Sequence, residues 1–136
     1  MNQSDIDIFF AALCCWREDR GGSPEERLGQ LCVIRNRVRA DWLKDNTYQD
    51  VVEHPYQFSA MSDPGDPNLI KNPRSTDPVW LSILPLAEQV ILGQQADITS
   101  GAVFYYSDPL TQPPHGWGPV VHTCDIGKLH FYRPFQ

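Results

Sequence analysis

The sequence has 136 residues, of which 41% are hydrophobic and 21% are charged, and this composition excludes a disordered acidic tail. Its length suits one hydrophobic core, so we expect residues 1–136 to form a single domain. The formal net charge of −6 arises from 17 acidic and 11 basic residues, which gives the chain no general attraction for nucleic acid or anionic lipid.

The longest apolar stretch near the start of the chain covers residues 8–16, which is too short to span a bilayer. No basic residue precedes this stretch, so it lacks the pattern of a secretory signal. We therefore expect a protein that is made in the cytoplasm without a signal peptide and that does not insert into a membrane.

The first third of the chain predicts two helices. One covers about residues 5–17 with Ser4 as its cap, and it is apolar nearly all round, which is typical of a central, buried helix. The other begins at Ser23, because Ser-Pro-Glu-Glu supplies a cap, a first-turn proline and, in Glu26, a capping-box acid. Apolar residues at helical spacing predict its buried face, and three arginines predict its wetter side: Arg35, Arg37 and Arg39.

The middle of the chain is rich in proline. A short helix is predicted over residues 48–53, with Thr47 as its cap. Residues 54–76 contain four prolines and predict a loop, with a short extended piece at 56–59. Loops of this length inside a compact domain are usually functional. A further helix is predicted over about residues 78–95, with Asp77 as its cap.

The last third changes to a strand-like pattern. Residues 102–106 predict one strand, and residues 120–123 and 128–133 predict a hairpin around 125–127. A rigid aromatic loop at 113–118 lies between them. The predicted fold class is therefore α+β and mainly helical, with a small β hairpin region near the C-terminus.

The cysteines and histidines carry no spacing that indicates a metal. No Cys-x-x-Cys pair or zinc-finger spacing exists, so we expect four unpaired, mostly buried thiols at Cys14, Cys15, Cys32 and Cys124. A hairpin would bring together up to three of the histidines His54, His115, His122 and His130, but no metal-binding motif joins them. A nucleophile pair of Cys124 with His115 has equally little support. We expect no metal and no cofactor.

Glu18 stands at the C-terminal edge of the first predicted helix. Burial and the negative end of the helix dipole act to raise its pKa, whereas Arg17 and Arg20 act to lower it. A carboxylic acid that stays neutral near neutral pH suits general-acid cleavage of a glycosidic bond. The alternative is a solvated helix-end glutamate that pairs with an arginine, which is the commoner arrangement.

A set of aromatic and polar residues forms a second candidate. Flat rings with polar handles, beside an amide and a hydroxyl, suit the apolar faces and polar rims of sugar rings. For any single aromatic of the set, ordinary core packing is the alternative. The set comprises Tyr56, Gln57, Phe58, Ser59, Tyr105, Tyr106 and Trp117.

Five segments of the chain resemble, in the right order, the cell wall hydrolase family of the spore-cortex-lytic type (SleB/CwlJ). Residues 16–22 with 29–38 resemble that family's opening "AEARGE…GQ.AVA.VILNRV". Residues 48–52 and 56–60 resemble "T..DVV…QFS", residues 101–106 resemble "GA..YY", and residues 126–132 resemble "IG.H.FY". The chain departs from the family at Asp19, which replaces an alanine, at Gly22, which replaces a second glutamate, and after the paired tyrosines at 107–108.

The resemblance implies a lysozyme-like single catalytic domain that cuts the glycan strands of peptidoglycan between N-acetylmuramic acid and N-acetylglucosamine. It places Glu18 on the family's catalytic glutamate, and it places 57–59 and 105–106 along the substrate cleft. We expect a lytic transglycosylase with one catalytic glutamate, of the phage endolysin type, that acts on the cell wall after release. Two alternatives stay open: a true hydrolase (muramidase) that uses Asp63 or Asp66, and a non-catalytic murein-binding or virion structural module.

Overall fold

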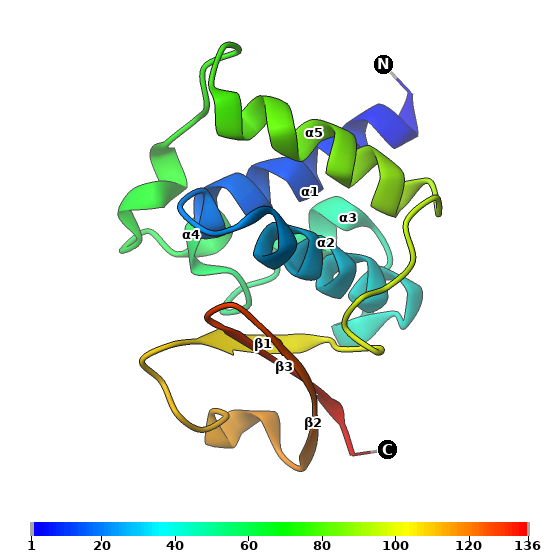
Figure 1. Ribbon diagram of the computed structural model, residues 1–136, viewed down its shortest axis with the longest axis vertical. Helices are drawn as coiled ribbons and strands as arrows, with labels where there is room; N and C mark the ends of the chain where they lie inside the picture. The colour runs from blue at the N-terminus through cyan, green and yellow to red at the C-terminus, as the bar shows by residue number, and fades with distance from the viewer. Residues whose placement is uncertain (1, 136) are drawn as a thin grey trace.

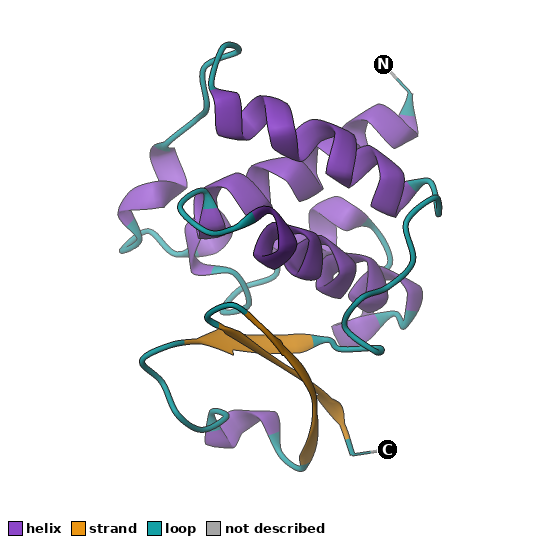
Figure 2. Cartoon of the chain, in the orientation of Figure 1, coloured by secondary structure: helices purple, strands orange, loops and turns teal. Residues whose placement is uncertain are grey.

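The computed structural model describes residues 2–135, and Figures 1 and 2 show helices at one end of the molecule and a small sheet at the other. The α+β, mainly helical fold class is confirmed. The helices are α1 (Gln3–Asp19), α2 (Pro24–Arg39), α3 (Tyr48–Glu53), α4 (Ser59–Ser62) and α5 (Pro78–Ile91), with 3-10 turns η1 (Trp42–Lys44), η2 (Pro67–Ile70) and η3 (His115–Trp117). The strands are β1 (Phe104–Ser107), β2 (Val120–Ile126) and β3 (Leu129–Pro134).

Local capping signals set most helix starts. Ser23 and Glu26 form the expected capping box of α2, Thr47 caps α3, and Asp77 caps α5. The cap expected for the first helix was wrong: Asn2, not Ser4, accepts the backbone N–H of Asp5, so α1 begins earlier than expected. The last helix, α5, ends at Ile91 rather than near residue 95, because Gly93 adopts a φ of +76° two residues later.

The expectation that residues 54–76 form only loop was also wrong. A short helix, α4, and the 3-10 turn η2 lie within it, and no strand forms at 56–59. Instead, Tyr56 has a φ of +68°, and the backbone N–H of Gln57 donates to the carbonyl of His54 to make a turn. Asp66 caps η2 by accepting the N–H of Asn68, and Pro67 suits the first position of that turn.

The helix α1 is the centre of the helical layer. Its residues 11–16 are all buried, and it packs against α2, α3, α4 and α5. The run of consecutive buried residues explains why the sequence of this helix is apolar on nearly every face. No helix among residues 2–135 is long and apolar enough to cross a membrane.

Two of the three arginines expected on the wet side of α2 are buried. Arg35 is 3% exposed and donates to the carbonyls of Val90 and Gln95, and Arg37 is 5% exposed and donates to the carbonyl of Val103. The expectation was wrong because carbonyls distant in sequence, at the end of α5 and in the segment that follows it, accept these guanidinium N–H groups. Only Arg39 is exposed.

The three strands form an antiparallel sheet in the order β1-β3-β2. The hairpin turn lies at Gly127 and Lys128, one or two residues later than expected, because Ile126 still pairs with Leu129. The sheet packs on α2, where an added Cβ on Gly29 would lie 2.7 Å from the Phe131 ring. Glycine at position 29 therefore permits the close approach of sheet and helix that positions β1 beside the helical layer.

Candidate active site

One cavity of about 640 Å³ brings the sequence-predicted site residues together. Its walls come from the end of α1, the segment before α4, the strand β1 and the loop around η3. The candidates that line it are Glu18, Tyr56, Gln57, Phe58, Ser59, Tyr105, Tyr106 and Trp117. Sequence reasoning weighed one of the three α2 arginines for the cleft without choosing among them, and Arg37 lines the cavity. It missed the other lining residues, which are Trp42, Leu43, Phe104, Ser107, Pro114 and Gly116.

Glu18 is half-buried at the end of α1, and among residues 2–135 it is the sole acidic residue of the lining. Its Oε1 accepts the backbone N–H of Ala60 at 3.4 Å. Burial raises the pKa of Glu18, the hydrogen bond from Ala60 acts to lower it, and the negative charges of Asp66 and Asp19 raise it further. Glu18 also lines a second hollow of about 420 Å³ beside Asp19 and Arg20.

The two arginines that flank Glu18 do not pair with it. Arg17 donates to the carbonyl of Lys71 at 2.9 Å and to the side chain of Asn72 at 3.1 Å. Arg20 donates to Asn68 at 2.8 Å, and its guanidinium lies 4.5 Å from the Trp16 ring centroid. Within residues 2–135, Glu18 makes no ion pair, so the alternative of an arginine-paired, solvated glutamate is wrong.

Aromatic rings form a flat wall of the cavity. The rings of Phe104 and Trp117 stack with centroids 4.6 Å apart, and Trp42 meets Phe104 edge-on at 5.1 Å. Tyr56 is 99% exposed at the mouth, whereas Phe58 is almost fully buried and belongs mainly to the core. This wall offers the apolar surface against which a sugar ring packs.

Tyr105 presents a phenol beside Glu18 that stays protonated. Burial raises its pKa well above the ordinary value, and the negative charge of Glu18 adds to the effect. The Nε2 of Gln30 donates to the Tyr105 hydroxyl at 3.2 Å, which leaves the hydroxyl proton free for another acceptor. Gln30 is a buried residue of α2 that sequence reasoning did not single out for this contact.

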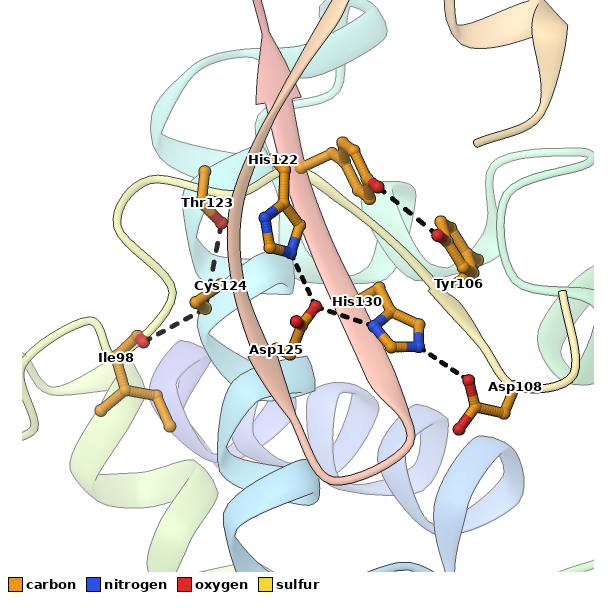
Figure 3. Close-up of polar contacts among 9 residues, drawn as sticks. Ile98, Tyr106, Asp108, His122, Thr123, Cys124, Asp125 and His130 are labelled. Atoms are coloured by element: carbon orange, nitrogen blue, oxygen red, sulfur yellow. Dashed lines mark hydrogen bonds and ion pairs between the residues drawn. The ribbon is translucent and has the colours of Figure 1, made fainter. Parts of the chain in front are cut away.

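Figure 3 shows a cluster of histidine and aspartate side chains at the sheet, and these side chains do not belong to the cavity lining of the described residues. His130 contacts Asp125 through Nδ1 at 2.7 Å and Asp108 through Nε2 at 2.8 Å, and His122 contacts the same Asp125 oxygen at 2.6 Å. A neutral imidazole donates from only one nitrogen, so this geometry favours the charged ring and raises the pKa of His130. Among residues 2–135, no three His, Cys, Asp or Glu side chains are placed to hold a metal ion.

The four cysteines are unpaired, and Cys14, Cys15 and Cys32 are buried. The Sγ of Cys124 contacts the carbonyl of Ile98 at 3.8 Å, and no hydrogen bond joins it to His115 within the described residues (Figure 3). Burial raises the pKa of the Cys124 thiol, which is the opposite of an activated nucleophile.

Comparison with known proteins identifies the family. The model of the cell wall hydrolase family matches residues 24–132, and the chain belongs to this family. Among solved structures, the catalytic domain of the Bacillus cereus SleB protein is similar, with a TM-score of 0.71 and 23% sequence identity over 98% of this chain and 92% of that chain. A search of curated proteins gave no match.

The family match confirms the resemblance and supports an enzyme that acts on the cell wall. The likeness to the SleB catalytic domain confirms the fold. Glu18 lies before the residues that the family model matches. The role of Glu18 therefore depends on the geometry of the cavity.

Proposed function

We propose that the protein cleaves the glycan strands of peptidoglycan between N-acetylmuramic acid and N-acetylglucosamine, with Glu18 as the proton donor. The observation that carries this proposal is the placement of Glu18: a half-buried carboxyl without an ion pair, in a cavity walled by aromatic rings. Burial raises its pKa, which keeps the proton available for the oxygen of the glycosidic bond.

The proposed reaction uses Glu18 twice, as in a lytic transglycosylase. Its carboxyl group protonates the bridging oxygen while the bond from that oxygen to the anomeric carbon breaks, and the acetamido group of the substrate stabilises the positive carbon. The resulting carboxylate then takes the proton of the sugar's own 6-hydroxyl, whose oxygen bonds to the anomeric carbon. The product is a 1,6-anhydro sugar, and Glu18 recovers its proton without water.

The cavity composition supports this one-acid chemistry. Retaining and inverting hydrolases usually place a second carboxylate about 5–9.5 Å from the acid. In the part of the chain that the structure describes, no acidic residue other than Glu18 lines the cavity. Tyr105 and Ser59 supply hydroxyl groups for the sugar, and Tyr106 and Trp117 supply rings against which it packs.

A true hydrolase is the second candidate, and Asp66 favours it. Its Oδ2 accepts the Ser59 hydroxyl at 2.7 Å, and hydrogen bonds from Ser59 and Asn68 hold its pKa below the usual value. An ionised Asp66 near Glu18 is a candidate base for water. Asp63 is exposed, and its carboxylate accepts the N–H of Gly65.

Product analysis separates the two chemistries. Digestion of purified sacculi in ¹⁸O-labelled water should give anhydro ends without label if Glu18 acts alone, and labelled reducing ends if water is the nucleophile. Asp66→Asn should remove most activity only in the hydrolase, and Asp63→Asn tests the other acid that a hydrolase could use; the lyase predicts little loss in either variant.

Glu18→Gln tests the catalytic assignment itself. The variant keeps the size of the side chain and loses the transferable proton, so it should release no soluble fragments from sacculi while its melting temperature does not fall. Retained release would contradict the assignment. Binding to sacculi by the wild type without any release would instead support a non-catalytic murein-binding or virion module.

We also propose that the protein acts on the cell wall after release from the cytoplasm, in the manner of a phage endolysin. External addition to intact and to permeabilised cells tests this: lysis only after permeabilisation is expected for an enzyme that reaches the wall from within.

A further inference from the structure

Arg37 is a buried cation on the cavity wall without an anionic partner. Its side chain is 5% exposed, and it lines the same cavity as Glu18. Among residues 2–135, no carboxylate lies within 4.0 Å of its guanidinium. Burial lowers its pKa to about 10, so the unliganded protein disfavours this charge. A buried charge without compensation is costly, and a bound anion would offset that cost.

The Arg37 guanidinium is held in place by hydrogen bonds that occupy only some of its N–H groups. Its Nε donates to the carbonyl of Val103 at 2.7 Å, its Nη1 donates to the side chain of Gln57 at 3.2 Å, and its carbon lies 4.9 Å from the Phe58 ring centroid. Nη2 makes no hydrogen bond to a described residue. A rigid guanidinium with free N–H groups suits a carboxylate, because the two form parallel charge-assisted hydrogen bonds.

Arg35, two residues earlier on α2, is a buried arginine that does not reach the cavity. It is equally buried, and its Nη1 donates to the carbonyls of Val90 and Gln95. Arg35 lines neither of the two hollows that Glu18 lines. Its position is that of a residue that ties a loop to the helix, whereas Arg37 combines the same burial with access to the cavity.

Arg37 and Glu18 are linked by one short segment. Gln57 accepts from Arg37, and the N–H of Ala60, three residues later, donates to Glu18. Three Cα–Cα steps span at most about 11 Å. This bound applies to Gln57 and Ala60. Arg37 and Glu18 line the same cavity, so an anion bound at Arg37 lies in the cavity that holds Glu18.

We propose that Arg37 forms an anion subsite that binds the free lactyl carboxylate of an N-acetylmuramic acid residue, so that the enzyme prefers glycan strands without stem peptides. This proposal rests on the proposed function of the same cavity. In strands that carry stem peptides, the lactyl group is a neutral amide and cannot form the ion pair. The reaction that supplies the preferred substrate is amide hydrolysis, in which water adds across the bond between lactyl group and peptide and frees the carboxylate.

Because its net charge is negative, the chain as a whole does not attract a carboxylate ligand by long-range charge. At −6, the protein as a whole repels carboxylates, and Arg37 is the sole basic residue that lines the cavity among the described residues. Recognition of a carboxylate in the cavity therefore depends on this one side chain.

The test compares two substrates that differ only at the lactyl group. Peptide-free strands with free carboxylates are prepared with an amidase, and half of them are converted to neutral methylamides. The wild type should cleave the free-carboxylate strands with a kcat/KM about tenfold higher, mainly through KM. Equal rates on both strands, or faster cleavage of the amide strands, would overturn the proposal without the need for any variant.

Variants assign the preference to Arg37. Arg37→Gln should cleave both strands equally, and Arg37→Lys should keep part of the difference. Arg39→Gln, which replaces an exposed arginine of the same helix outside the cavity lining, should keep all of it. A preference that survives in a folded Arg37→Gln protein would refute the assignment. Thermal unfolding establishes that each variant is folded, and Arg37→Lys keeps the test valid if Arg37→Gln does not fold.

Binding separates this proposal from the proposed function. The Glu18→Gln variant should bind free-carboxylate strands about tenfold more tightly than methylamide strands. If no strand is cleaved but this difference in binding is found, the catalytic proposal fails and the anion subsite stands. If strands are cleaved and the difference is absent, the subsite fails alone. If no strand is bound or cleaved, both fail.

Discussion

Replacing Asp19 with asparagine should stabilise the protein near neutral pH and leave its stability nearly unchanged near pH 4. The Oδ2 of Asp19 is buried and has no hydrogen-bond partner among residues 2–135. Burial is the largest cause that raises the pKa of Asp19 from 3.8 to about 6, and the negative charge of Glu26 adds to it, while Arg27 acts to lower it. The ionised carboxylate is therefore less favourable in the folded protein than in the unfolded chain.

The pKa shift sets the size and the pH range of this effect. A shift from 3.8 to about 6 corresponds to an upper bound of about 3 kcal/mol at neutral pH. Asp19 is only half-buried, so solvent screening reduces the expected gain for Asp19→Asn to about 1–2 kcal/mol. Because the folded state holds the proton more tightly, the penalty is absent below about pH 4, grows between the two pKa values, and is complete above about pH 6.

Thermal unfolding of the wild type and Asp19→Asn at both pH values measures the effect. The variant should melt about 3–8 °C higher near pH 7 and at nearly the same temperature near pH 4. Asp63→Asn is the control, because Asp63 is exposed, and it should show no such gain. A lower melting temperature for Asp19→Asn near pH 7 would show that the carboxylate is stabilised in the fold, by Arg27 for example, and would refute the reasoning.

Three further predictions concern charges around the site and the sheet. Asp66→Asn should move the high-pH limb of the activity profile to lower pH, because the Asp66 charge helps to raise the pKa of the Glu18 proton donor; an unmoved limb would contradict this coupling. Arg17→Met should lower the free energy of unfolding by about 1 kcal/mol, seen in urea titrations, because it removes the hydrogen bonds that hold residues 71–72; an unchanged midpoint would contradict that role. Because the pKa of His130 is raised, its contacts with Asp125 stabilise the sheet at low pH, and this stabilisation is lost as pH rises through that pKa. In thermal melts between about pH 6 and 8, Asp125→Asn should therefore lose less stability than the wild type, by about 1 kcal/mol or less. An equal pH dependence of stability in both proteins would contradict this role.

Features that depend on neighbours in the sequence could be predicted well. Ser23, Thr47 and Asp77 cap their helices as expected, because a cap needs only its own side chain and the N–H two or three residues later. The prediction of where α1 begins was wrong because Asn2 and Ser4 can both act as caps, and the local sequence does not choose between them.

Features that depend on distant contacts could not be predicted. From their charge, Arg35 and Arg37 were predicted to lie on the solvent-exposed side of α2. Both side chains are buried instead, because the carbonyls of residues 90, 95 and 103 accept their hydrogen bonds. The helical turn α4 within the proline-rich segment also escaped prediction, because proline content indicates loop irrespective of tertiary contacts.

The candidate site was assembled from chemistry and resemblance together. The position of Glu18 at a helix end and the chemistry of the aromatic residues made them candidates, each with a structural alternative. These candidates all line one cavity. Phe58 fits both the core and the site interpretation, because it is buried in the hydrophobic core and also lines the cavity. Arg37 could not be singled out for the site, because nothing local distinguishes it from Arg35 and Arg39 or from a solvated arginine.

Mass spectrometry of the soluble fragments that the wild type releases from purified sacculi tests the central claim most directly. Cleavage by Glu18 predicts fragments that end in new N-acetylmuramyl residues, at the bond to N-acetylglucosamine. Release of stem peptides from intact glycan strands, or tight binding to sacculi without any soluble fragment, would contradict it.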